Sequence, residues 1–355
     1  MIRFLARRLL WFVVTLFVVM AVSFFLMHQV KGGPFDGERT LNPAIEANIK
    51  ARYHLDWPLW KQFWHYVGPI NLADDGPQFF AQDEDGWHFL KGARFFVSDD
   101  EGFSLVRADP GVDLWTGVLA GDFGPSFRYR DFTVNDIIAQ SLPISMLLGI
   151  VAMMWALSLG VSAGIASALR RGSGLDLAMR LAATGGIALP NFVIASFLII
   201  LFVFLIPLFP VAGWGTLKHM ILPGFCLGLV FAAYIARLTR TGMLEVLSQD
   251  HIRTAQAKGL APHTVVLRHA LKGGILPVVS YLGPATAGIL TGSLVIERIF
   301  FIPGTGSHFV NSATNRDYTL SMGVTILYTV LVYGMNTIVD LAYTFLDPRI
   351  KLEDD

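Results

Sequence analysis

The chain has 355 residues, of which 54% are hydrophobic and 15% are charged, and its formal net charge at pH 7 is zero. This composition is far more apolar than that of a soluble globular domain, so it excludes an ordinary soluble protein and predicts an integral membrane protein. A helix needs about 20 mostly apolar residues to cross about 30 Å of hydrocarbon. Six segments meet or approach this length without an internal charge: residues 9–30, 142–169, 181–209, 220–236, 273–296 and 318–339.

The first segment follows Arg3, Arg7 and Arg8, as the apolar part of a secretory signal would. The stretch after it, HQVKGGP, has no small-residue cleavage site. We therefore expect residues 1–30 to be a retained membrane anchor and not a removed leader.

The second part of the chain, residues 31–141, carries 17 Asp or Glu against 10 Lys or Arg. Four short runs rich in aromatic and β-branched residues, QFFA, WHFL, RFFVS and FSLVR, are separated by the turn-forming stretches DEDG, KGA and DDEG. This pattern predicts a small antiparallel β meander, with an irregular loop as the alternative. The acidic balance argues against binding to nucleic acid or to an anionic membrane surface.

The remaining residues, 142–355, hold five of the six predicted spans. The run 181–217 is uncharged but contains Pro190, Pro207 and Pro210, and we treat it as one span that ends near Phe209. Cationic loops are retained on the cytoplasmic side. Because the cations gather at the two ends of the chain and in the loops at 170–180 and 237–272, we expect both termini to be cytoplasmic and residues 31–141 to lie outside.

The cytoplasmic stretch at residues 237–272 is too long and too polar for a simple turn. Leu244, Val246 and Leu247, followed by Ile252, Ala255 and Ala257, predict a short amphipathic helix. Gly259 then allows a left-handed turn, and Pro262 fits the first turn of a second helix. Two helices joined in this way would offer Thr254, Lys258 and Leu260 to a cytoplasmic partner.

Metal and nucleotide chemistry have little support in the chain itself. It contains no GxxxxGK[ST] phosphate-binding loop and no HExxH motif. His251, His263 and His269 are twelve and six residues apart and have no Cys or carboxylate at ligand spacing, so surface histidines are the better interpretation. The single cysteine, Cys226, excludes an internal disulfide.

Polar and helix-breaking residues inside the predicted spans are candidates for a translocation path, because irregular backbone survives at membrane depth only in protein or beside water. The candidates are Pro190, Asn191, Thr286, Thr291 and Ser293. Close helix packing by small residues is the alternative for each of them. Asp340, near the inner end of the last span, either pairs with a cytoplasmic arginine or reaches the interface.

The stretch RTAQAKGLAPHTVVLRHALKGGILPVV resembles the cytoplasmic signature loop of permease subunits of binding-protein-dependent ABC importers, in the branch for dipeptides and oligopeptides with its nickel relatives. In that family this loop forms a coupling helix that sits in a cleft of the ATPase subunit. The resemblance places Arg253, Thr254, Ala255 and Gly259 where the general signature has Glu, Ala, Ala and Gly. The acidic first position is therefore absent here.

Other stretches are similar to the same branch, among them IRFLARRLLWFVV, GDFGPSFRYRDFTVNDIIAQSLPISMLLG, SLVIERIFFIPGTG and VDLAYTFLDPRI. Residues 68–113 have no counterpart and are interpreted as an insertion in the first outer loop. The resemblance implies an all-α, six-helix membrane protein and assigns the coupling role to Arg253, Thr254, Ala255, Lys258, Gly259 and Leu260. It also implies an outer gate or docking loop that contains Glu297, Arg298, Pro303 and Gly304.

The implied partners are a second related permease subunit, two ATPase subunits that bind ATP and Mg, an extracytoplasmic solute-binding protein and its peptide, and membrane lipid. No enzyme activity and no cofactor are expected in this chain, which would lie in the cytoplasmic (inner) membrane of a prokaryote. The alternative is a self-sufficient secondary transporter or channel, which would need ionisable groups at mid-span and inverted repeats. The cargo, the role of the insertion and the identity of the partner permease stay open.

Overall fold

The computed structural model describes residues 2–29, 48, 50–51, 53–68, 72, 78–83, 86–91, 93–99, 102–108, 116–129 and 131–346. The chain divides into two compact units. Unit 1 consists of Met1–Phe12, Gln140–Val310 and Leu327–Asp355, and unit 2 of Val13–Ala139 and Asn311–Ile326.

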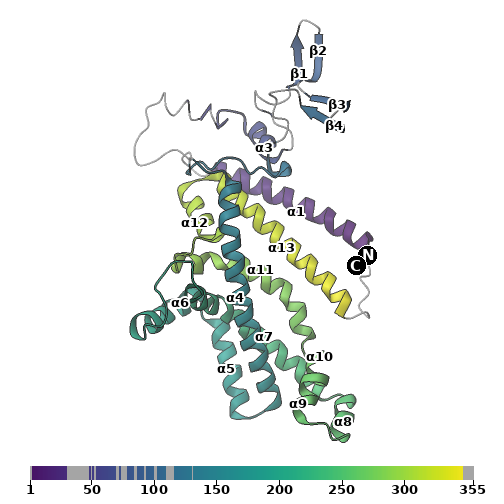
Figure 1. Cartoon of the computed structure of the whole chain (residues 1–355), viewed down its shortest axis with the longest axis vertical. Coiled ribbons are helices and arrows are strands. Elements are labelled where there is room, and N and C mark those ends of the chain that lie inside the picture. Colours follow the sequence, from purple (N-terminus) through teal and green to yellow (C-terminus); the bar gives the residue numbers. More distant parts are fainter. Residues whose placement is uncertain are drawn as a thin grey trace. The chain divides into compact units, whose positions relative to one another are not determined.

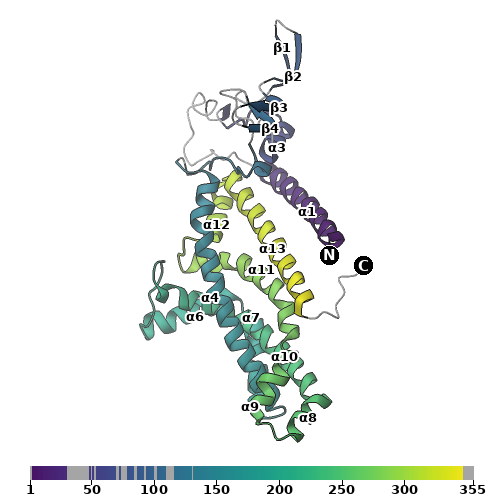
Figure 2. The same cartoon turned by 45° about the vertical axis from the view of Figure 1, so that its right-hand side comes forward.

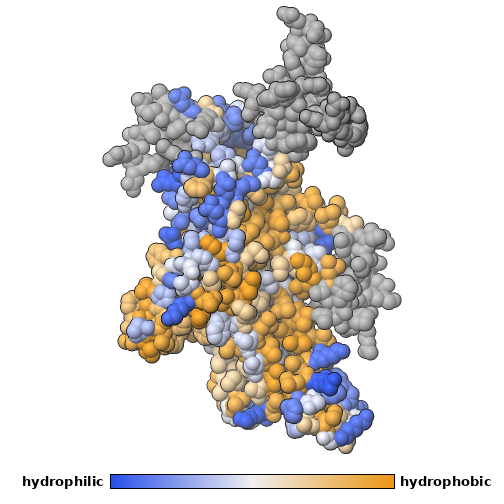
Figure 3. Space-filling view, viewed as in Figure 1, coloured by the Kyte–Doolittle hydropathy of each residue, from blue (hydrophilic) through white to orange (hydrophobic). Residues whose placement is uncertain are grey.

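Among the described residues, four helices are long and apolar enough to cross a membrane. They are α1 (Ile2–Gln29), α4 (Val134–Leu169), α7 (Leu217–Leu247) and α13 (Tyr318–Leu346), and they contain four of the predicted spans (Figure 1). Many of their apolar side chains face outward, as Leu10 does with 63% exposure. Hydrophobic side chains also cover much of the helical surface seen in Figure 3. A surface of this kind suits contact with lipid and not with water.

The other two predicted spans are bent. Residues 181–209 fall in α5 (Gly174–Ala188), α6 (Asn191–Ile199) and the π-helix η2 (Ile200–Leu205), with a bend of 105° between α5 and α6. Pro190 causes this bend, because it restricts Leu189 to an extended conformation (φ −86°, ψ 129°) and cannot donate a helical hydrogen bond. The segment α9 (Pro262–Thr264), η3 (Val265–Ala270) and α10 (Leu271–Gly274) meets α11 (Leu276–Ile299) at 54°.

Helix α7 is the central element of unit 1 and packs against α5, α6, α10 and α11. Small residues allow its close approach to α4: a Cβ on Gly228 would lie 2.3 Å from the Ala152 carbonyl oxygen, and one on Gly160 would lie 2.7 Å from the Ala232 carbonyl oxygen. Such backbone proximity is typical of helix pairs in membranes. The core around these contacts includes Leu148, Leu227, Ile289 and Ile296.

Unit 2 is built around the later turns of α1, the short helix α3 (Leu59–Val67), the 3-10 helix η1 (Val118–Ala120) and the first turns of α13. Its buried core includes Met20, Phe24, Phe63, Tyr318 and Met322. The core is rich in aromatic rings, and Phe24 and Phe63 meet edge to face at 5.3 Å between centroids. Large rings supply much buried area from few residues.

Four strands lie in the region predicted to be an insertion: β1 (Gln78–Asp83), β2 (Gly86–Lys91), β3 (Ala93–Asp99) and β4 (Gly102–Ala108). β1 pairs with β2 and β3 pairs with β4, both antiparallel, with Phe80 opposite Phe89 and Phe95 opposite Val106. Within the described strands, β2 does not pair with β3. The region therefore forms two separate hairpins, which differs from the single meander expected from the sequence.

Candidate functional site

The segment after α7 contains two short helices joined by a left-handed turn. Helix α8 (Asp250–Ala257) and α9 lie beside each other near the end of α10 (Figure 2). Gly259, between them, has φ +75°, a conformation that a β-branched residue adopts only with strain, and Pro262 is the first residue of α9. The predicted turn at Gly259 and helix start at Pro262 are confirmed. Leu244–Leu247 belong to the end of α7 and not to the short helix, because the helix is interrupted at Ser248 and Gln249 before α8 begins.

The two faces of α8 differ sharply. Ile252 and Ala255 are buried against residues of α7 and η3, among them Met243, Val246 and Val265. Arg253, Thr254, Lys258, Gly259 and Leu260 are exposed. Of the six residues predicted for the coupling role, five share an open surface, and Ala255 instead anchors the helix to the rest of unit 1.

A fully buried carboxylate lies at the end of α11. The Glu297 side chain accepts a hydrogen bond from the Ser145 hydroxyl (2.7 Å) at Oε1 and one from the Ser307 backbone N–H (3.1 Å) at Oε2. Ser307 is in the first turn of α12 (Thr305–Asn315), where the helix dipole favours a negative charge. The Ser145 hydroxyl in turn accepts the Thr305 N–H at 2.8 Å. A buried charge needs such partners, and here they come from two separate elements, α4 and α12.

The PGTG turn leaves room for this carboxylate because two of its residues lack side chains. A Cβ on Gly304 would lie 2.4 Å from Oε2 of Glu297, and one on Gly306 would lie 2.9 Å from the same oxygen. Among the residues predicted for the outer loop, Glu297 and Gly304 are therefore in contact, whereas Arg298 and Pro303 are exposed beside them. Ser145 was missed by the sequence analysis, because it lies 152 residues away in α4.

His308, in α12, is close enough to this cluster to be affected by it. Burial lowers the pKa of the imidazole below its ordinary value, and the negative charge of Glu297 opposes this shift in part. The ring is therefore neutral at pH 7.

The predicted path residues occupy two different environments. Pro190 is exposed at the bend between α5 and α6, and Asn191 begins α6. In α11 the Thr286 hydroxyl donates to the Leu282 carbonyl (2.7 Å), and the buried Ser293 hydroxyl donates to the Leu290 carbonyl (2.9 Å). Both hydroxyls are therefore hydrogen-bonded within their own helix. Thr291 is also in α11, but its side chain lies outside the described part of the structure.

An apolar groove of about 860 Å³ lies beside the bend at Pro190. It is lined by residues of α4, α5, α6 and α7, including Leu159, Gly186, Val193, Phe197 and Ala233. Phe197 is 63% exposed in this groove. The groove was not predicted from any sequence pattern. The bend at Pro190 shapes it by bringing together helices that are distant in sequence.

A buried ion pair joins α5 to α7. Asp176 is 1% exposed and accepts two hydrogen bonds from Arg240, from Nε at 2.8 Å and Nη2 at 2.9 Å. The Ser167 hydroxyl and the Gly172 N–H also donate to this carboxylate. A two-point arginine–carboxylate contact fixes orientation as well as distance. Arg240 is two turns before the end of α7, so this pair holds the helix that leads into α8.

Asp340 forms an ion pair with Arg8, and the Arg8 guanidinium also lies over the Tyr333 ring. This is one of the two alternatives that the sequence left open. Within the described residues, no group of three or more His, Cys, Asp or Glu could hold a metal ion.

In the part of the chain that the structure describes, four apolar helices of spanning length, two bent helix pairs and an exposed amphipathic helix define a helical membrane protein. The fold is similar to that of a chain in the inward-facing MetNI methionine ABC transporter, with a TM-score of 0.51 over 59% of this chain and 96% of the other, at 15% identity. This likeness concerns the fold alone.

Residues 160–352 match the family described as binding-protein-dependent transport system inner membrane component, and residues 1–81 match the N-terminal part of such membrane components. The chain belongs to this family.

Within the family, the chain is homologous to the permease subunits of oligopeptide and dipeptide ABC importers. It is 41% identical over 353 residues to the oligopeptide transport system permease protein OppB of Escherichia coli K12, covering 99% of this chain and 100% of the relative. It is 40% identical to OppB of Haemophilus influenzae and 39% identical to the dipeptide transport system permease protein DppB of Bacillus subtilis 168, each across 99% of this chain. The resemblance seen in the sequence is thereby confirmed.

Proposed function

We propose that the chain is one of two transmembrane subunits of an ATP-driven importer for peptides delivered by an extracytoplasmic binding protein. The observation that carries this proposal is the full-length match to oligopeptide and dipeptide permeases. ATP and Mg would be bound by two separate ATPase subunits, and this chain would supply half of the translocation path.

In the proposed arrangement each bent helix pair is one span, which gives six spans with both termini in the cytoplasm of a prokaryotic cell. The tendency of cationic loops to stay inside supports this orientation, since it places Arg170 and Arg171, in the loop after α4, on the same side as the cationic segment 237–272. The core 142–355 would then follow an extracytoplasmic module at 31–141, with its insertion at about 68–113.

The exposed face of α8 would contact the ATPase subunit. Arg253 and Thr254 form this face together with Lys258, Gly259 and Leu260 of the turn that follows α8, and Ala255 is buried beneath it. Because Ile252 and Ala255 are buried against α7 and η3, a displacement of α8 moves the helices that flank it. A polar helix held in this way can convert closure of the ATPases into tilting of membrane spans.

The loop at Glu297, Arg298, Pro303 and Gly304 would form the outer gate or a docking surface for the binding protein. Its support is the buried carboxylate cluster, which gives the loop a defined conformation. The path itself would run beside the bend at Pro190 and Asn191, where the apolar groove faces the second permease. Thr286, Thr291 and Ser293 remain candidates as polar residues of α11, which also contains Pro284.

Replacing Gly259 with valine tests the coupling role. A β-branched residue is strained at φ +75°, so the turn between α8 and α9 should change and ATP hydrolysis should no longer drive uptake. We expect the assembled transporter to lose most peptide uptake in proteoliposomes while keeping ATPase activity and membrane insertion. Gly121→Val is the matched control, since Gly121 also has positive φ (+83°) and nothing within 4 Å of an added Cβ but lies outside the coupling segment.

Two results would overturn the proposal. Undiminished uptake by Gly259→Val at normal expression would remove the coupling role. Peptide uptake by this chain alone in liposomes without ATP would instead establish a self-sufficient secondary transporter.

A further inference from the structure

Helix α3 has no part in the proposed coupling surface or path, and with nine residues it is too short to cross a membrane. Its sequence, LWKQFWHYV, separates apolar from polar side chains around the helix axis at about 100° per residue. The apolar side holds Leu59, Trp60, Phe63, Trp64 and Val67, and the polar side holds Lys61, Gln62 and His65. The two sides therefore need two different surroundings.

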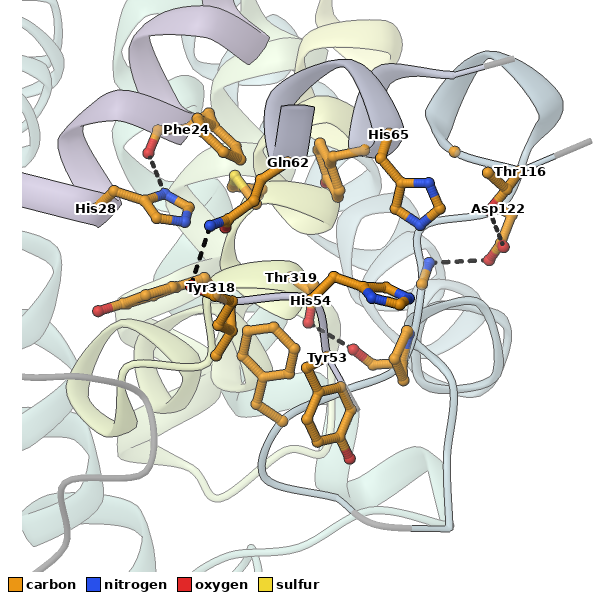
Figure 4. Close-up of a pocket in the computed structure, with 17 residues that line it drawn as sticks. Phe24, His28, Tyr53, His54, Gln62, His65, Thr116, Asp122, Tyr318 and Thr319 are labelled. Carbon is orange, nitrogen blue, oxygen red and sulfur yellow. Dashed lines mark hydrogen bonds between the residues drawn. The ribbon is translucent and has the colours of Figure 1, made fainter. Parts of the chain in front are cut away.

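The polar side of α3 is turned toward the interior of unit 2. Gln62 and His65 line a cavity of about 250 Å³, and Figure 4 shows both side chains among the residues around it. The Gln62 amide donates to the Trp57 carbonyl at 2.8 Å, and the Leu72 backbone N–H donates to His65 Nδ1 at 3.3 Å. The Lys61 ammonium lies 3.5 Å from the centroid of the Trp57 ring. The polar groups of α3 thus have partners within its own unit.

The apolar side of α3 is covered only in part. Phe63 and Val67 are buried in the core of unit 2. Trp60 is 64% exposed and Trp64 is 48% exposed, and Leu59 is exposed beside them. The two tryptophans are four residues apart, so they lie on the same side of the helix. A helix that turns its polar side inward and two indole rings outward is unfavourable in water.

The exposed side of α3 is continuous with the exposed side of α1. The Trp64 and Phe17 rings are 6.2 Å apart between centroids, and the Phe63 and Phe25 rings stack at 5.7 Å. Phe17 and Phe25 are themselves partly exposed and belong to the predicted span 9–30. They lie about 18 Å and about 6 Å before the end of α1 along its axis. α3 therefore packs against a part of α1 that lies within the membrane.

The chemistry of this side fits lipid better than protein. An indole ring combines a large apolar body with one N–H donor, which suits the boundary between hydrocarbon and headgroups. Short helices that carry tryptophan and leucine on one side and polar residues on the other lie along this boundary. A protein partner would have to enter the bilayer to reach Trp64, because Phe17 beside it belongs to a membrane span.

We infer that α3 is an interfacial helix whose exposed side, formed by Leu59, Trp60 and Trp64, is inserted among phospholipid acyl chains beside α1. The cation of Lys61 stays out of the hydrocarbon, because it is held over Trp57 on the opposite side of the helix. The inserted rings give unit 2 an attachment to the membrane in addition to α1 and α13.

The test uses the full chain reconstituted in phosphatidylcholine vesicles, with the fluorophore NBD on a cysteine in place of Trp60 or Trp64. Cys226 is fully buried and stays unlabelled. Phosphatidylcholine with a doxyl spin label on its acyl chain quenches NBD in hydrocarbon, and iodide quenches NBD in water. The lipid control is Val18→Cys on the exposed side of α1, and the water control is Asp131→Cys, an exposed position in unit 2.

We expect the spin-labelled lipid to cause about half or more of the fluorescence loss at Trp60→Cys and Trp64→Cys that it causes at Val18→Cys. Leu59→Cys reports on the same side should either variant fail to fold. A smaller loss overturns the inference: with strong iodide quenching the exposed side lies in water, and with weak iodide quenching protein covers it. The measurement needs neither ATP nor peptide, so a failure here is distinguishable from a failure of ATP-driven uptake.

Discussion

Gly304 shows how one residue determines the conformation of the outer loop. Its missing side chain leaves space for the Glu297 carboxylate and the Ser145 hydroxyl, which would lie 2.4 Å and 2.6 Å from a Cβ at this position. Gly304→Ala should therefore displace the buried carboxylate and destabilise the protein by about 1–3 kcal/mol, as overpacking in a tight core does. Thermal unfolding of the purified protein measures this change. Gly334→Ala in α13, where nothing lies within 4 Å of the added Cβ, should leave the transition unchanged, and equal loss in both variants would contradict the argument.

At the scale of secondary-structure elements, the Asp176–Arg240 pair fixes α5 against the helix that leads to α8. Removing only Arg240 leaves a buried carboxylate without its main partner, which destabilises a protein more than removing both charges does. Arg240→Met should lower the melting temperature clearly, and the double variant Asp176→Asn/Arg240→Met should recover much of the loss. Arg253→Met breaks an exposed pair with Asp250 and should have little effect. No recovery in the double variant would show that the pair does not act as a unit.

The same elements show what could be predicted from the sequence. Hydropathy located the spanning segments, and Gly259 and Pro262 located the turn before α9, because both signals are local. The bend at Pro190 was visible only as a break, since a proline shows where a helix stops but not the 105° at which it resumes. The Asp176–Arg240 pair and the Ser145–Glu297 bond join residues 64 and 152 positions apart, and no local pattern carries that information.

For the whole molecule, we expect the proposed second permease to pack where the apolar surface is concave. The groove beside Pro190 joins α4, α5, α6 and α7, and its small residues allow another helix to approach closely. A ring inside it, Phe197, and a side chain on α1, Leu10, are both 63% exposed, so exposure alone does not distinguish them. The shape of the surrounding surface distinguishes the two side chains, because a groove can be filled by a partner helix whereas the exposed side of α1 suits lipid.

Cysteine cross-linking separates these two surfaces in native membranes. The chain has one cysteine, Cys226, and it is fully buried, so an introduced thiol will dominate the reaction. Phe197→Cys, with a cysteine on the facing helix of the second permease, should form a disulfide under mild oxidation, whereas Leu10→Cys with the same partner should not. Cross-linking through Leu10→Cys in place of Phe197→Cys would move the interface to α1 and leave the groove to lipid.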